Sequence, residues 1–380
     1  MKNSIKLLAA AVAAASALDA SAAQIYSKND TTLDVTGYVE AVYFSGHNNK
    51  VKGADGDATI GNRTRFGLQG RTKIAENIYG MGKFEHQWQN NGDSQNNDET
   101  TRDQWVGVDF TQGGVLKAGR YLNNEYKIEQ VTDVLERLGG YGESFATRNS
   151  GKINYSISYA GFSGAFEYQT ATNSYSFSDG VVDVDHGFSA VLGYKSPAVL
   201  FGPIGVQLAA GYLKFQDDGI TDTKTYRSYD EKNPTTFGDV NVSRIFSELD
   251  HENSFGASMT WGTYGSGLYL ATWYQQIKGE AYDQYRYDDL TIKNSESLIA
   301  YSFDNGISLH AGYQWKDYDV REAYTTAGNA ANTIRRKVPL MVSWNLNPNF
   351  RVWADDVIDA GSSDDLADDN IFSVGARYVF

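Results

Sequence analysis

The chain has 380 residues with 38 glycines, 26 tyrosines and no cysteine, so disulfide scaffolds and thiolate metal sites are excluded. Lysine and arginine number 33 against 47 aspartates and glutamates, which gives a net charge of −14. This charge argues against nucleic acid as a partner, because phosphate binding needs a basic surface. The abundance of tyrosine favours β-structure.

The N-terminal segment has the features of an export signal. A lysine-containing start precedes an apolar run over residues 7–18, and the small residues at 21–23 suit a signal peptidase. The run is too short for a helix to span a bilayer core of about 30 Å. We predict that residues 1–23 are a signal peptide cleaved after Ala23, with cleavage just before Ala23 as the alternative. Residues 24–380 are expected to form one domain.

No later segment is suited to a membrane-spanning helix. After residue 23, no uninterrupted apolar stretch reaches the roughly 18 residues that such a helix needs. The nearest candidate, residues 197–213, is interrupted by Pro197 and Pro203. Because proline in a helix interior costs about 3 kcal/mol, this segment is interpreted as a turn followed by a strand.

The signal that recurs is an alternation of apolar and polar residues with a period of two. It runs from residue 307 to 316, and again over residues 338–344 and 372–380. Aromatic side chains lie near the ends of these segments, including Trp344 and Phe380, as expected for girdles at the two membrane interfaces. Strands in a bilayer must pair all their backbone groups, so they are expected to close into a barrel.

Turn signals along the chain give the number of strands. Tight turns are expected at residues 75–77, 112–114, 160–164, 264–267, 304–306 and 347–349, on one rim. Long polar stretches at 46–58, 90–100, 171–185, 216–251, 278–290, 317–333 and 360–369 are assigned to the opposite, external rim. Single strands are then expected at 31–44 and 370–380, with pairs at 60–89, 101–121, 150–170, 186–215, 252–277, 293–316 and 335–359. The predicted fold class is all-β, a 16-stranded antiparallel transmembrane β-barrel with an aqueous lumen.

Four features carry a family resemblance when they are taken in chain order. They are Arg65-Phe66-Gly67-Leu68-Gln69-Gly70, the segment from Gly119-Arg120-Tyr121 to residues 132–140, Thr147-Arg148-Asn149-Ser150, and the terminal Phe380. With these features the chain resembles the general, trimeric porins of the Gram-negative outer membrane. The resemblance covers essentially the whole mature chain.

The resemblance implies a pore constriction. In this family the third external loop, about residues 121–147 here, folds inward and narrows the pore opposite a ladder of arginines. By position, Arg65, Arg102 and Arg148 match the ladder, Arg120 flanks it, and Asp133 matches an acidic residue at the loop tip. The resemblance also implies a homotrimer in the outer membrane.

The alternation of residues tests these assignments independently. Arg63, Arg65 and Arg71 share one face, which we expect to be the lumen because charges facing lipid cost about 2 to 4 kcal/mol at mid-bilayer. Strict alternation turns Arg102 toward lipid instead. A β-bulge near Gln104 would turn it inward.

The loop tip departs from the family pattern. Glu136 and Arg137 stand where the family usually has proline and glutamate, and Leu138 takes the aromatic place. Asp133 and Glu136, opposite the arginines, would create a transverse field across the water of the pore. Alternatively, the two carboxylates cap a short helix over residues 132–138.

The predicted function is passive diffusion of ions and small hydrophilic solutes. Removing residues 1–23 leaves 31 basic and 46 acidic side chains, so the mature charge of −15 favours cations, while Arg137 opposes them locally; we expect weak cation selectivity. Outer-membrane lipid and lipopolysaccharide are expected partners. The five histidines are dispersed, so no catalysis, metal or cofactor is expected.

Two other functions remain open from the sequence. A solute-specific channel, for a sugar for example, could use lumen aromatics such as Trp353 as a stacking path. A surface adhesin or receptor could act through long external loops such as residues 216–251.

Overall fold

The structure is a computed structural model that describes residues 23–45, 59–90, 98–136, 148–177, 180–216, 220–229, 237–246, 248–283, 286–320, 333–362 and 371–380. The predicted signal peptide lies outside these residues except for Ala23, and Arg137 also lies outside them. Among the described residues, no helix has the length and apolar character needed to cross a membrane.

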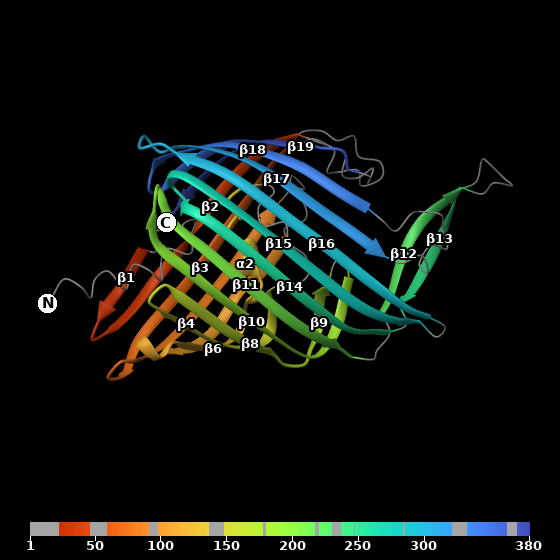
Figure 1. Ribbon diagram of the computed structural model, residues 1–380, viewed down its shortest axis with the longest axis horizontal. Coiled ribbons are helices and arrows are strands. Elements are labelled where there is room, and N and C mark those ends of the chain that lie inside the picture. Colours follow the sequence, from red (N-terminus) through yellow and green to blue (C-terminus); the bar gives the residue numbers. More distant parts are fainter. Residues whose placement is uncertain are drawn as a thin grey trace.

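Sixteen antiparallel strands close into a barrel (Figure 1). They are β2 (Thr31–Ser45), β3 (Thr59–Ala75), β4 (Ile78–Asn90), β5 (Asp98–Asp109), β6 (Val115–Leu122), β7 (Arg148–Tyr159), β8 (Phe162–Gln169), β10 (Gly180–Val199), β11 (Gly202–Phe215), β14 (Glu248–Thr263), β15 (Ser266–Asp283), β16 (Arg286–Ser302), β17 (Ile307–Val320), β18 (Thr333–Asn347), β19 (Phe350–Asp359) and β20 (Ile371–Val379). The barrel is closed because β2 pairs with both β3 and β20. The predicted fold class and strand count are confirmed.

Four further strands extend the barrel at its two ends. β1 (Ala23–Lys28) pairs with the start of β2 and β20 pairs with the rest of it, so both ends of the chain share one edge of β2. β9 (Thr172–Phe177) pairs with β10 beyond β8, and with β1 it completes an 18-stranded sheet. β12 (Ile220–Tyr229) and β13 (Phe237–Phe246) form a separate hairpin at the end of the barrel away from both termini (Figure 1).

The two faces of the strands differ as the alternation predicts. On β17, Leu309 and Tyr313 are exposed on the outside, whereas His310 and Gln314 are buried on the inside. The outer surface is therefore apolar and suits lipid, while the inner surface carries the polar side chains. Any charged residue on the inner face can contact the lumen or a segment folded into it.

One segment does fold into the barrel. The loop after β6 carries the short helix α2 (Tyr126–Glu129), which contacts β11, β14 and β15 from inside. We call residues 123–136, the described part of this segment, the constriction loop. Its helix lies before residues 132–138, where the sequence suggested one, and residues 132–136 form turns and bends instead.

Candidate pore constriction

Apolar contacts hold the constriction loop against the inner wall. Ile128, Val134 and Leu135 are buried in one cluster with Trp273 of β15 and Trp353 of β19. Removing a side chain of this size from water stabilises the contact between loop and wall by about 1.5 to 3 kcal/mol. An inner wall that faced only water would not need these residues, so the loop position is built into the sequence of the wall.

Two hydrogen bonds fix the register of the loop on this wall. The hydroxyl of Tyr269 donates to the carbonyl of Val131 at 2.8 Å. The indole N–H of Trp273, a side chain only 2 % exposed, donates to the hydroxyl of Thr132 at 2.7 Å. The tip residues that follow Thr132 are therefore placed by the β15 wall.

Glycines on the wall make room for the loop. A β-carbon at Gly211 would overlap the carboxylate of Glu125, and one at Gly256 would press on Ile128. Gly211 lies on β11 and Gly256 lies on β14, and these two strands are neighbours in the sheet. The missing side chains let the loop lie close to the barrel backbone.

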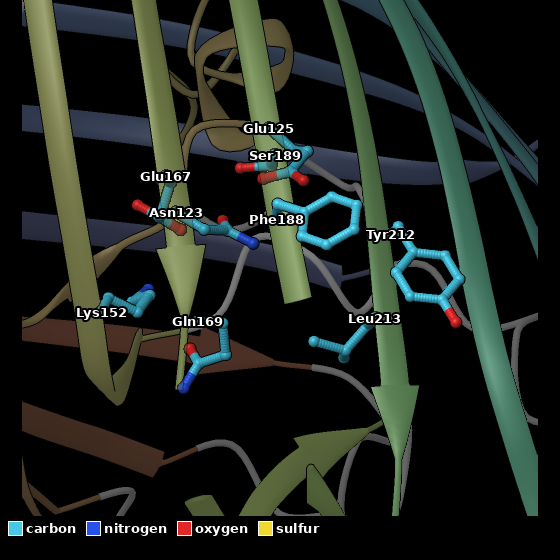
Figure 2. A pocket seen from close by; sticks show the side chains of 9 residues that line it. All are labelled: Asn123, Glu125, Lys152, Glu167, Gln169, Phe188, Ser189, Tyr212 and Leu213. Atoms are coloured by element: carbon cyan, nitrogen blue, oxygen red, sulfur yellow. The ribbon is translucent and has the colours of Figure 1, made fainter. Parts of the chain in front are cut away.

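A buried polar cluster anchors the start of the loop (Figure 2). Glu125, Lys152 and Glu167 line a cavity of about 20 Å³ between the loop and the wall of β7, β8, β10 and β11, large enough for about one water molecule. Asn154 donates to Asn124 at 2.8 Å and Lys152 donates to the carbonyl of Tyr121. Burial, reinforced by repulsion from Glu167, raises the pKa of Glu125 to about 8, so this carboxyl is mostly protonated at neutral pH.

The protonated Glu125 predicts a pH dependence of stability. The pKa of this carboxyl is 4.5 in an ordinary setting and about 8 in the folded protein. The contribution of Glu125 to the free energy of unfolding is therefore complete below pH 4.5 and is lost as the pH rises to about 8. We expect the melting temperature of the detergent-solubilised protein to fall between pH 5 and pH 9. Glu125→Gln, which mimics the protonated form, should reduce this fall, and an equal fall in both proteins would contradict the assignment.

Three arginines predicted as a ladder meet on one side of the lumen. Arg65 of β3, Arg102 of β5 and Arg148 of β7 are joined through two carboxylates, Glu85 and Asp103. Arg102 donates to Glu85 at 2.7 Å, Arg148 donates to Asp103 at 3.2 Å, and Arg65 lies 3.7 Å from Glu85. We call these five residues with Lys83, which contacts both carboxylates, the ladder cluster. Its described members are four cationic and two acidic side chains.

A β-bulge turns Arg102 inward. Glu85 pairs with Asp103 while His86 pairs with Thr101, so Arg102 is the extra residue on β5. The predicted bulge lay near Gln104, two residues further along. The bulge explains how Arg102 can contact Glu85 although Val106, of the same parity, is exposed on the lipid side.

A second charged cluster holds the loop tip on another part of the wall. Glu136 pairs with Arg351 of β19 at 3.0 Å and with Arg377 of β20, and Arg377 also donates to Glu40 of β2 at 2.7 Å. Arg63 of β3 donates to the other oxygen of Glu40 at 2.7 Å. We call these five residues the tip cluster. Glu136 therefore pairs with arginines outside the predicted ladder.

The state of each loop carboxylate follows from its neighbours. Burial alone would raise the pKa of Glu136, but the charges of Arg377 and Arg351 outweigh it and hold the pKa below its usual value. Asp133 accepts a hydrogen bond from the hydroxyl of Tyr126. Burial raises the pKa of Asp133 even though Tyr126, Arg102 and Arg148 act in the opposite direction. Glu136 is thus firmly ionised, whereas Asp133 gains a proton more readily than an ordinary aspartate.

The remaining predicted residues lie at the edges of the site. The side chain of Arg120 donates to the carbonyl of Thr101 at 2.7 Å, beside the ladder cluster. Arg71 pairs with Asp109 at 3.0 Å and lies over the ring of Tyr79. Arg137 lies outside the described residues.

Six charged residues of the two clusters have no predicted role in the sequence. They are Glu40, Lys83, Glu85, Asp103, Arg351 and Arg377. The alternation puts Glu85 on the face opposite to its outward-facing neighbour Phe84, and it puts Arg377 between two outward-facing neighbours. The sequence therefore indicates that both side chains face the lumen, but it does not indicate which residues they pair with. Within the described part of the chain, no group of three histidine, aspartate or glutamate side chains could hold a metal ion.

Comparisons with known proteins agree with this architecture. The family model described as Gram-negative porin matches residues 28–380. The outer membrane porin PhoE of Klebsiella oxytoca is 28 % identical over 100 % of this chain and 99 % of its own length. The structure of Salmonella typhi OmpF in complex with daunomycin superposes with a TM-score of 0.69 at 18 % identity, over 94 % of this chain and 100 % of that one.

A trimer form of in-vitro folded OmpT, an outer membrane protein of Vibrio cholerae, superposes with a TM-score of 0.60 at 16 % identity, over 92 % of this chain and 99 % of that one. At these identities the solved structures support the fold alone, whereas the family match extends over nearly the whole chain. The barrel with its inward loop and the family match lead to one conclusion: the chain belongs to the Gram-negative porin family and is a porin of the outer membrane.

Proposed function

We propose that the constriction loop, the ladder cluster and the tip cluster form the narrowest part of a channel through which ions and small hydrophilic solutes diffuse passively. The observation that carries this proposal is the ion pairing of Glu136, on the loop, with Arg351 and Arg377 on the wall. With Asp133 near Arg102 and Arg148, charged groups line the path on two sides. Such a path favours hydrated and dipolar solutes and slows apolar ones. The chain acts without catalysis.

The channel is weakly cation-selective in this proposal. The mature chain carries 31 basic and 46 acidic side chains, which concentrates cations near its mouths. The ladder cluster, the tip cluster and Asp133 together have the opposite balance. Their seven cationic residues, Arg63, Arg65, Lys83, Arg102, Arg148, Arg351 and Arg377, face five acidic ones, Glu40, Glu85, Asp103, Asp133 and Glu136. The two contributions oppose one another, so the net preference is small.

The assembly proposed is a homotrimer in contact with outer-membrane lipid and lipopolysaccharide, formed after residues 1–23 are removed. The trimer form of the Vibrio cholerae OmpT structure supports this assembly by analogy. A sugar-specific channel with a stacking path at Trp353 has less support, because that side chain is only 3 % exposed and packs against the loop.

The reversal potential of single channels under a KCl gradient tests the role of Asp133. We expect a small cation preference in the wild type and a smaller one in Asp133→Asn, because one negative charge leaves the constriction. Lowering the pH should bring the wild type toward the variant, since the pKa of Asp133 is raised. Equal selectivity of both proteins at neutral pH would show that Asp133 does not line the constriction. Correctly folded protein without conductance would show that the chain does not form a channel.

A further inference from the structure

The two carboxylates of the constriction loop are held in different ways. Glu136 forms ion pairs with Arg351 and Arg377, which belong to the wall. Asp133 forms no ion pair within 4 Å in the part of the chain that the structure describes, but it accepts a hydrogen bond from the hydroxyl of Tyr126. The wall therefore fixes Glu136, whereas a side chain of the loop itself fixes Asp133.

The packing of the loop tip turns Asp133 toward the lumen. Thr132, Val134 and Leu135 are buried, and the two apolar residues belong to the cluster on the wall. The side chain of Asp133, between them, is only partly buried. The charges of two arginines of the ladder cluster act on its carboxyl group. Asp133 is therefore the residue of the tip that faces the ladder cluster.

The phenol ring of Tyr126 is placed by the structure of the loop. Tyr126 is the first residue of α2 and lies seven residues before Asp133. The N–H of Gln130 donates to the carbonyl of Tyr126 at 2.8 Å. The N–H of Thr132 donates to the carbonyl of Glu129 at 3.0 Å, and the charge of Glu129 also acts on the phenol. These bonds fold the segment back on itself, so that the hydroxyl reaches the carboxylate.

Several groups act on the carboxyl group of Asp133. Burial raises its pKa, and the negative charge of Glu136 acts in the same direction. The hydrogen bond from Tyr126 is the strongest influence in the opposite direction, ahead of the charges of Arg102 and Arg148. Arg148 also faces Tyr126. The hydroxyl of Tyr126 therefore does more than either arginine to keep Asp133 ionised.

We propose that Tyr126 is a positioning residue for ion selectivity: its hydroxyl fixes the carboxylate of Asp133 in the solute path and keeps it ionised there. This role depends on the function proposed above, in which Asp133 lines the path. A phenol has one proton to donate, and a hydrogen bond to a carboxylate is stronger than one between neutral groups. The single hydroxyl thus sets both where the negative charge lies and how readily a proton removes it.

Tyr126→Phe tests this role, because it keeps the ring and removes only the hydroxyl. The reversal potential of single channels under a KCl gradient is measured as the pH is lowered from neutral. Cation preference should fall in both proteins as Asp133 takes up a proton. Loss of the donor raises the pKa of Asp133 further, so the midpoint of this fall should lie about one pH unit higher in the variant. A ring that served only to pack the loop would leave the midpoint unchanged.

Two further variants serve as controls. Tyr269→Phe removes a hydroxyl that donates to the carbonyl of Val131 at 2.8 Å, in the same loop, and should keep the wild-type midpoint. Tyr126→Phe combined with Asp133→Asn should have the selectivity of Asp133→Asn alone at every pH, because the hydroxyl then has no charge to stabilise.

Failure of this role and failure of the proposed function give different results. A wild-type midpoint in Tyr126→Phe, or an effect of Tyr126→Phe that persists in the Asp133→Asn background, would overturn the positioning role and leave the channel in place. Equal selectivity of the wild type and Asp133→Asn at every pH would contradict the place of Asp133 in the constriction, and with it the role of Tyr126.

Discussion

Trp273→Ala should detach the constriction loop from the wall and increase the single-channel conductance. The side chain is fully buried in the loop cluster and its indole N–H holds Thr132. Replacement of a buried tryptophan by alanine costs about 3 to 5 kcal/mol, so the contact between the loop tip and the wall should be much weaker. The released loop should leave a wider path, so the conductance rises and the current becomes noisier.

Two variants make this test specific. Trp273→Phe keeps most of the apolar contact and loses the hydrogen bond to Thr132. Its conductance should therefore lie between those of the wild type and Trp273→Ala. Trp344→Ala removes an exposed tryptophan from the lipid side of β18 and should leave the conductance unchanged. Wild-type conductance in correctly folded Trp273→Ala would show that the loop does not narrow the pore.

Glu136→Gln should shift the selectivity toward anions more strongly than any other single substitution at the constriction. The substitution removes the carboxylate that pairs with both Arg351 and Arg377. The three arginines of the tip cluster then share a single carboxylate, that of Glu40. Two unit charges about 7 Å apart interact by about 0.6 kcal/mol in water and about 2.4 kcal/mol at an effective dielectric of 20. The ratio of cation to anion permeability should therefore fall several-fold, as measured by the reversal potential.

The pH and a matched substitution check this assignment. Because the arginines hold the pKa of Glu136 below its usual value, Glu136 should stay ionised at mildly acidic pH. The difference in selectivity between the wild type and Glu136→Gln should therefore persist at that pH. Glu76→Gln removes a carboxylate from the short turn between β3 and β4 and should change the selectivity much less. Equal shifts in the two variants would mean that overall charge, and not the tip cluster, sets the selectivity.

The barrel was predictable because its signals are local. Alternation with a period of two identifies a strand and its outer face within ten residues, as on β17, where Leu309 and Gln314 lie on opposite faces. Turn residues such as Asp304-Asn305-Gly306 mark where a strand ends. These signals need no knowledge of what lies across the lumen, so sixteen strands could be counted from the sequence.

The constriction was only partly predictable because its contacts are distant in sequence. Glu136 and Arg377 are 241 residues apart, and no local pattern shows that they meet. The bulge at Arg102 overrides strict alternation, and only the register of β4 against β5 shows which residue is the extra one. Gly211, an ordinary strand glycine in the sequence, proves to make room for Glu125.

Cysteine accessibility shows whether the constriction loop narrows the lumen. The chain has no cysteine, so a single introduced thiol is the only reactive one. A bulky charged methanethiosulfonate reagent added to an open Asp133→Cys channel should reduce the conductance stepwise, because Asp133 lies on the loop near Arg102 and Arg148. Leu192→Cys, on the exposed outer face of β10, is the control and should not respond. An unchanged current through Asp133→Cys after verified modification would show that the loop tip does not narrow the lumen.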